Sequence, residues 1–111
     1  MEIEVERNGM VVVAVVAGEV DASTAPGLRE QFDELLAEGQ QNFVIDLSGV
    51  GFMDSSGLAT LVQLFKRVRI GHGDVRLCGL QPEVQRVFEL TRLDRVFDLF
   101  RDRGEAVASF G

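Results

Sequence analysis

Residues 43–68 read FVIDLSGVGFMDSSGLATLVQLFKRV, and this stretch decides the fold. Its first five residues, Phe43-Val44-Ile45-Asp46-Leu47, form a short apolar run that is typical of a strand. A helix is expected to begin near Ser55, because apolar residues then recur every three or four positions, at Leu58, Leu61, Val62, Phe65 and Val68. A strand followed closely by an amphipathic helix predicts one unit of a parallel sheet.

The N-terminal side of this unit predicts a hairpin and a helix. Ile3 and Val5 alternate with glutamates, and Asn8-Gly9 favours a two-residue turn into the apolar run Val11–Val16. The chain is therefore expected to open with two antiparallel strands. Thr24 can then cap a helix that starts at Ala25, with Pro26 in its first turn and Gly39 at its end.

The C-terminal side predicts more units of the same kind. Residues 75–79 read as a strand, Pro82 opens a third helix, residues 96–100 form a short last strand, and residues 102–109 a last helix. Strands separated by helices pair in parallel. The whole chain, 1–111, is thus expected to be one α/β domain, with a mixed, mostly parallel sheet of four to five strands, an N-terminal antiparallel hairpin and about four helices.

Composition excludes several classes of function. The formal net charge is −7, which disfavours nucleic acid and anionic membrane surfaces as partners. The longest apolar run, Met10–Ala17, is far shorter than the ~20 residues of a membrane span. A single cysteine, Cys78, and a single histidine, His72, allow neither an internal disulfide nor a Cys/His zinc site. A cytoplasmic protein with no metal and no cofactor is expected.

The segment Asp54-Ser55-Ser56-Gly57 is the candidate control point. It lies where a parallel strand turns into a helix, a place that favours ligand and partner sites. Ser55 is expected at or next to the N-cap, where the free N–H groups of the first turn accommodate a phosphate. On local physics alone, Asp-Ser-Ser is also an ordinary capping string. The two interpretations are compatible, because a capping serine can be phosphorylated.

Gly57 needs a reason of its own. Glycine inside a helix costs ~1 kcal/mol relative to alanine, so it indicates either close internal packing or the close approach of another protein to this turn.

The chain resembles the STAS domain family, and within it the anti-sigma factor antagonists. Phe52-Met53-Asp54-Ser55-Ser56-Gly57-Leu58 resembles the family's phosphorylation segment, and Gly18-Glu19-Val20-Asp21 resembles the segment after its second strand. Residues 80–88 and 93–97 resemble its C-terminal part. Two positions depart from the pattern. Ala59 stands where some members have a second glycine, and Arg92, where many have a glycine, is expected to alter the end of the third helix.

This resemblance implies a regulatory binding protein with no enzymatic activity. The unphosphorylated antagonist would bind an anti-sigma factor, itself a serine kinase, and release the sigma factor; phosphorylation would block binding, and a serine phosphatase would restore it. The family's acceptor maps to Ser55, with Ser56 the lesser candidate. The residues expected to face the partner are Asp21, Ser23, Thr24, Asp54, Ser56, Gly57 and Leu58.

Other functions and roles stay open at this point. A STAS scaffold that is never phosphorylated is the main alternative, and a monomer or weak dimer is expected. A nucleotide-binding protein or enzyme is disfavoured, because no Walker-type or Gly-x-Gly-x-x-Gly stretch occurs. His72 is expected in a solvated loop and Cys78 as an inert core thiol. Asp46 is expected to be a solvated carboxylate at a strand end.

Overall fold

A computed structural model describes all of residues 1–111. Its elements, in chain order, are β1 (Glu2–Asn8), β2 (Val11–Ala17), α1 (Ala25–Ala37), β3 (Asn42–Gly49), α2 (Ser55–Ile70), β4 (Asp74–Cys78), α3 (Pro82–Leu90), the short 3₁₀ helix η1 (Leu93–Arg95), β5 (Asp98–Phe100) and α4 (Arg103–Ala108).

The five strands lie side by side in the order in which they occur in the sequence. β1 and β2 are antiparallel, while β2, β3, β4 and β5 are parallel. A two-residue turn can join only antiparallel strands, whereas each parallel pair needs a crossover, which here contains α1, α2 or α3. The prediction of a mixed, mostly parallel sheet with an N-terminal hairpin and four helices is confirmed.

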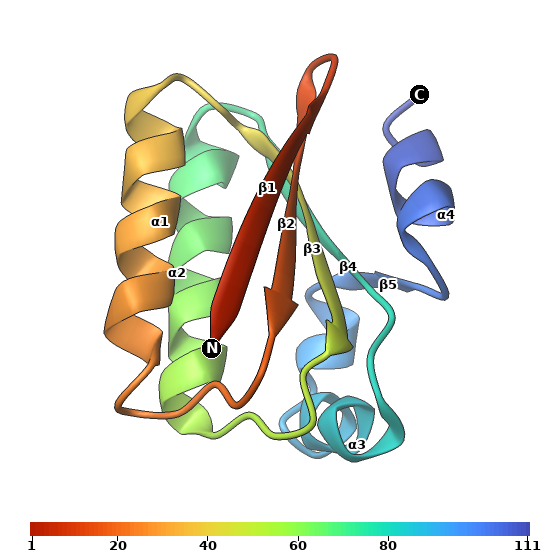
Figure 1. Cartoon of the computed structure of the whole chain (residues 1–111). Coiled ribbons are helices and arrows are strands. Elements are labelled where there is room, and N and C mark those ends of the chain that lie inside the picture. The colour runs from red at the N-terminus through yellow and green to blue at the C-terminus, as the bar shows by residue number, and fades with distance from the viewer.

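The helices cover the two faces of the sheet unequally. Figure 1 shows α1 and α2 together on one face and α4 alone on the other, with α3 below the sheet. Side chains alternate along a strand, so Val12, Ala14 and Val16 of β2 join the 21-residue cluster under α1 and α2. Val11 and Val13 point the other way, into a five-residue cluster that includes Ala106 of α4. The main core therefore lies on the α1–α2 side.

The buried face of α2 is close to the predicted stripe. Leu58, Leu61 and Val68 are buried as expected, and Leu64, which the stripe left out, is buried as well. Phe65 is only half-buried and packs edge-to-face on Phe97, with ring centroids 5.2 Å apart. The buried side chains of Leu58 and Leu61 pack the first turns of α2, and with them the candidate control point, against the core.

The end of α3 shows how the chain accommodates Arg92. The helix stops at Leu90, and Arg92 then adopts a left-handed conformation with φ of +62°. That conformation is the reason many helices place a glycine after their C-cap. Arg92 therefore differs from the family's glycine in residue type, but it still forms the left-handed turn that ends the helix.

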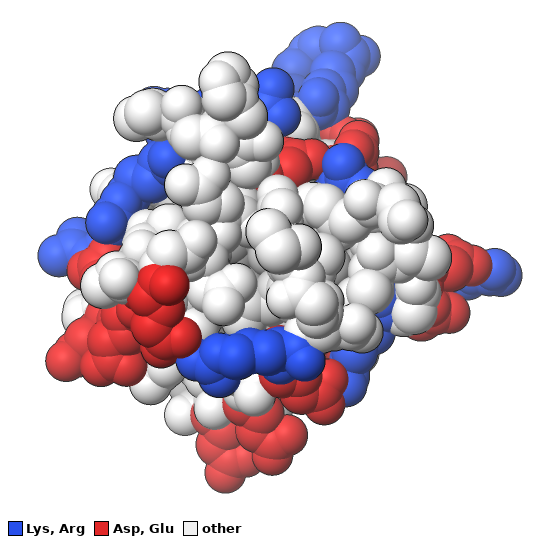
Figure 2. Space-filling view, turned by 90° about the horizontal axis from the view of Figure 1, so that it is seen from above, with Lys and Arg blue, Asp and Glu red and all other residues white.

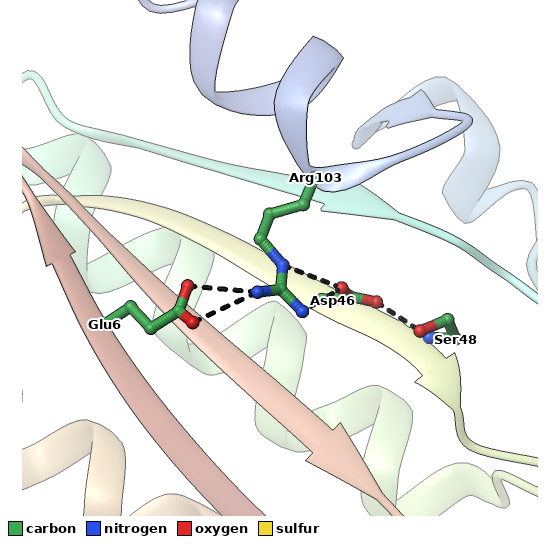
Figure 3. Close-up of polar contacts among 4 residues, drawn as sticks. All are labelled: Glu6, Asp46, Ser48 and Arg103. Carbon is green, nitrogen blue, oxygen red and sulfur yellow. Dashed lines mark hydrogen bonds and ion pairs between the residues drawn. The ribbon is translucent and has the colours of Figure 1, made fainter.

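Asp46 corrects an expectation from the sequence. It is not a solvated strand-end carboxylate: its exposed fraction is 5%, and it lies on the face of the sheet covered by α4. Arg103 at the start of α4 donates to it from Nε at 3.1 Å, and the same guanidinium reaches Glu6 of β1 at 3.0 Å (Figure 3). The backbone N–H of Ser48 also donates to it at 3.0 Å. Asp46 therefore anchors α4 on the sheet.

The surroundings of Asp46 determine its ionisation. Burial by itself raises the pKa of this carboxyl, but hydrogen bonds from Ser48 and the pairing with Arg103 outweigh it, and the pKa lies below the ordinary value. The ionised form thus stabilises the fold at any pH above the ordinary aspartate range. As the pH falls through the lowered pKa, Asp46 is protonated and that contribution is lost.

We expect Asp46→Asn to lower the free energy of unfolding by about 2 kcal/mol at pH 7, because Arg103 loses its buried charged partner. The difference from the parent chain should shrink on acidification, as the parent's own carboxylate becomes neutral. Urea denaturation at neutral and acidic pH measures both effects. Arg101→Gln is the control: it removes an exposed pair with Glu105 and should cost less than about 0.5 kcal/mol. Equal effects of the two substitutions at pH 7 would contradict the anchoring role.

Candidate functional site

Two loops meet at the lower end of the sheet, where β2 and β3 finish (Figure 1). The loop before α1 and the loop before α2 are joined by a single parallel bridge between Val20 and Met53. Val20 N–H donates to the carbonyl of Phe52 at 3.0 Å, and Asp54 N–H donates to the carbonyl of Val20 at 3.1 Å. This bridge brings together the segments of Asp21 and Asp54, which are 33 positions apart in the sequence.

Asp54 is the N-cap of α2, and Ser55 is the first residue of the helix. The Asp54 carboxylate accepts hydrogen bonds from the N–H groups of Ser56 at 2.8 Å and Gly57 at 3.3 Å. The first-turn donors that could receive a phosphate are therefore already engaged by a carboxylate. A phosphate on Ser55 would compete with Asp54 at the same helix start.

Ser55 and Ser56 differ in their surroundings. Ser55 is exposed, whereas Ser56 is half-buried and its carbonyl accepts from the Thr60 hydroxyl at 2.9 Å. Ser56 also lines a hollow of about 230 Å³ between α1 and α2, whose other walls are Ala22, Ala25, Pro26, Arg29, Ala59, Thr60 and Gln63. Ser55 is thus the more accessible hydroxyl, and Ser56 belongs to the wall of a shallow groove beside it.

The Asp21 loop is shaped by its own carboxylate. Oδ1 of Asp21 accepts from the N–H of Ser23 at 2.9 Å, the Ser23 hydroxyl at 2.6 Å and the N–H of Thr24 at 3.2 Å. The hydrogen bond from the Ser23 hydroxyl is the main reason that the pKa of Asp21 lies below its ordinary value. The loop therefore presents a fixed negative charge at neutral pH.

Thr24 occupies the N-cap position of α1 as predicted, but its side chain does not cap the helix. Its hydroxyl accepts from Asp21 N–H at 2.9 Å and donates to the carbonyl of Glu19 at 2.9 Å. The expected capping hydrogen bond is therefore replaced by bonds that close the loop.

Packing inside the chain explains why position 57 is a glycine. It is buried, and a Cβ added there would lie 2.7 Å from Cγ of Met53 and 2.8 Å from Cγ1 of Val20. Leu58 beside it belongs to the main core. The sequence left two explanations for this glycine open, and the structure shows close packing within the chain. Gly57 and Leu58 are buried and lie beneath the exposed residues of the site.

Phe52 is a feature of the site that sequence reasoning did not single out. Its side chain is half-exposed, and it borders a hollow of about 150 Å³ between the loop and α3, lined also by Gly51, Met53, Glu83, Val84 and Val87. The sequence does hold a clue to Phe52: it is an aromatic residue in a loop, two positions before the acidic N-cap Asp54, and it lies outside the apolar pattern of the strands and helices.

Groups that could support catalysis lie elsewhere. His72 is in the turn after α2, at the opposite end of that helix from Ser55. Cys78 is buried in the sheet, and burial raises the pKa of its thiol to about 12. No cluster of three His, Cys, Asp or Glu side chains is arranged to hold a metal ion. None of the helices has the length and apolarity to cross a membrane.

Known proteins resemble this chain in sequence and in fold. The STAS domain model matches residues 2–106. An anti-sigma-B factor antagonist from Listeria monocytogenes is 35% identical over 100 residues, covering 90% of this chain and 88% of its own. An anti-sigma F factor antagonist from Paenibacillus polymyxa is 28% identical over 108 residues, covering 96% and 92%. The crystal structure of an anti-sigma factor antagonist from Mycobacterium paratuberculosis superposes with a TM-score of 0.89 at 31% identity, covering 97% and 92%.

The packing at Gly57 leads to a test by substitution. Gly57→Ala should lower the free energy of unfolding by about 1–3 kcal/mol, because the new methyl group overlaps Val20 and Met53. Gly104→Ala is the matched control, since a Cβ there meets only the Asp102 carboxylate, at 3.4 Å. Thermal or urea denaturation of both variants measures the difference. A Gly57→Ala chain as stable as the control would show that the two loops are not packed this closely.

Proposed function

The chain belongs to the STAS domain family, and on that basis we propose that it is an anti-sigma factor antagonist whose binding is controlled at Ser55. The relatives that cover nearly the whole chain carry that name. The observation that carries the proposal is the exposed Ser55 at the start of α2, flanked by the bridged loops of Asp21 and Asp54.

In this proposal the unphosphorylated chain binds a cognate anti-sigma factor in the cytoplasm and frees the sigma factor. The anti-sigma factor is also the serine kinase that phosphorylates Ser55, and a serine phosphatase removes the phosphate. The chain itself catalyses no reaction and needs no cofactor. Its role is to present one hydroxyl within a surface that the partner fits.

The charges at the site indicate how one phosphate would release the partner. Phosphorylation adds roughly −1.5 to −2 charges. Here they would fall beside Asp54, whose carboxylate already uses the N–H groups of Ser56 and Gly57. The Asp21 carboxylate in the adjoining loop adds a second negative charge. A hundredfold loss of affinity needs only about 2.7 kcal/mol. Local repulsion is sufficient for that loss, and no change of fold is required.

The partner surface would comprise the accessible residues around Ser55. Asp21, Ser23, Thr24, Asp54 and Ser56 all lie at the surface or half-buried, whereas Gly57 and Leu58 lie beneath them. Phe52 adds a large apolar side chain to this otherwise polar and acidic surface. Aromatic side chains beside a pocket often dominate the binding energy of an interface.

Substitutions at Ser55 test the switch. Ser55→Ala should bind the cognate anti-sigma factor like the parent chain, whereas Ser55→Asp should bind at least tenfold more weakly, because its charge mimics part of the phosphate. Calorimetry measures both affinities, and Ala108→Glu, an added charge on the exposed side of α4, is the control.

Phosphorylation supplies the second half of that test. Incubation with the anti-sigma factor and ATP should add one phosphate, which peptide mass spectrometry should locate on Ser55. Equal binding by the alanine and aspartate variants, without phosphate on Ser55, would favour a STAS scaffold that is not phosphorylated.

Phe52→Ala should weaken binding to the same anti-sigma factor by about 10- to 100-fold, because an exposed apolar anchor is lost. Phe52→Leu should retain most of the affinity. Ile70→Ala is the matched control: Ile70 is also exposed and apolar, but it lies at the other end of α2. If Phe52→Ala and Ile70→Ala bind equally well, the partner does not contact the loop before α2.

A further inference from the structure

The end of the domain opposite Ser55 carries a second surface feature. The turn between β1 and β2, the connection between α1 and β3, and the turn between α2 and β4 meet there around a hollow of about 360 Å³. Figure 2 looks down on this end and shows a broad expanse of uncharged residues, with Lys, Arg, Asp and Glu gathered mainly around it. We refer to the residues that line this hollow, together with Ile70, as the neutral face.

The neutral face is unusual for this chain. Charged residues make up 26% of the sequence and the net charge is −7. Around the hollow, however, Glu38 is the one charged residue, and its carboxylate is paired with Arg7 at 2.5 Å. The remaining lining residues are glycines, Met10, His72 and the amides Gln40, Gln41 and Asn42. Depletion of charge distinguishes the centres of protein interfaces from the rest of a surface.

Two apolar side chains project from this end without a role in the core. Met10 is 81% exposed in the hairpin turn and Ile70 is 83% exposed as the last residue of α2. They are the most exposed of the large hydrophobic side chains. Met10 borders the hollow, and Ile70 directly precedes Gly71, which lines it. The neutral face thus combines projecting apolar groups with a recess.

Two glycines allow close packing on one side of the recess. A Cβ on Gly73 would lie 2.0 Å from the carbonyl oxygen of Gln41, and one on Gly71 would lie 2.5 Å from the Gln41 side chain. The N–H of Asp74 donates to that same Gln41 carbonyl at 3.1 Å. A surface that is already ordered loses little conformational entropy when it binds.

We propose that the neutral face is where two copies of this chain meet in a weak two-fold homodimer. In a two-fold contact each patch meets its own copy, so a patch with one sign of charge repels itself. The amides of one copy can donate hydrogen bonds to those of the other and accept hydrogen bonds from them. Met10 and Ile70 of one copy can pack against the same apolar side chains of the other. Each group on this face can therefore be matched by an identical partner. Two chains of net charge −7 repel each other overall, and a contact through a face with no unpaired charge adds least to that repulsion.

The small size of the neutral face and its position in the domain determine what kind of dimer it can form. Stable interfaces use about 20–30 residues a side, more than the neutral face supplies, so the association should be weak and concentration-dependent. The two Ser55 sites would lie at the far ends of the two copies, because Ser55 begins α2 and the neutral face adjoins the other end of that helix. Each copy could then bind its own partner. The dimer does not depend on the function proposed above.

Sedimentation equilibrium of the full chain, at concentrations from about 5 to 500 μM, tests the proposal. We expect reversible dimers whose dissociation constant falls as salt is raised, because salt screens the repulsion between two acidic chains. Met10→Asp and Ile70→Glu, on two different elements, should each raise the dissociation constant at least tenfold. Leu90→Glu, at a side chain 74% exposed at the end of α3, should leave it unchanged.

Three results would overturn the proposal. A chain that stays monomeric at the highest concentration has no such contact. A dimer that is unaffected by both variants, with circular dichroism showing them folded, uses another face. A dimer that weakens as salt is raised is held by ion pairs between the copies, which the neutral face does not offer, because its one carboxylate, Glu38, is paired with Arg7 of the same chain.

Discussion

The close approach of α2 to Val20 is the constraint on which the site depends. Only a residue without a Cβ leaves room for Val20 and Met53 against the first turn of the helix, and Gly57 is that residue. With the helix seated there, Val20 exchanges backbone hydrogen bonds with Phe52 and Asp54, and the two loops become one surface. The main core then fixes α2 through Leu61, Leu64 and Val68. Ser55 is presented at one place because the backbone around it has little freedom.

Local sequence pattern was enough to predict most of the fold. The alternation at Ile3 and Val5, the Asn8-Gly9 turn and the apolar spacing after Ser55 each depend on neighbours a few residues away, and each led to the right element. Ser55 was found for the same reason, because an N-cap string before an apolar stripe is local information. The role in binding that we propose for it comes from family resemblance, since capping alone has the same sequence signature.

The errors and omissions involve partners that are distant in sequence. Local sequence predicts a solvated carboxylate at Asp46, because its partner, Arg103, lies 57 residues further along the chain. The reason for Gly57 depends on Val20, which belongs to a different loop. The Thr24 hydroxyl does not cap α1 because it hydrogen-bonds to the backbone of Glu19 and Asp21 instead. Phe52 and the neutral face become visible only when surface exposure is known.

The contact between Arg103 and Glu6 bears on how the molecule folds. Because the strands pair in chain order, each strand finds its neighbour soon after it is synthesised, and little loop-closure entropy is lost at any step. The bond from Arg103 to Glu6 spans 97 residues and joins the first strand to the last helix. It can form only after Arg103 has been synthesised, when all five strands already exist in the chain. α4 is therefore the last of these elements that can join the sheet, and a chain that is cut short before Arg103 leaves Asp46 on the sheet without a cation.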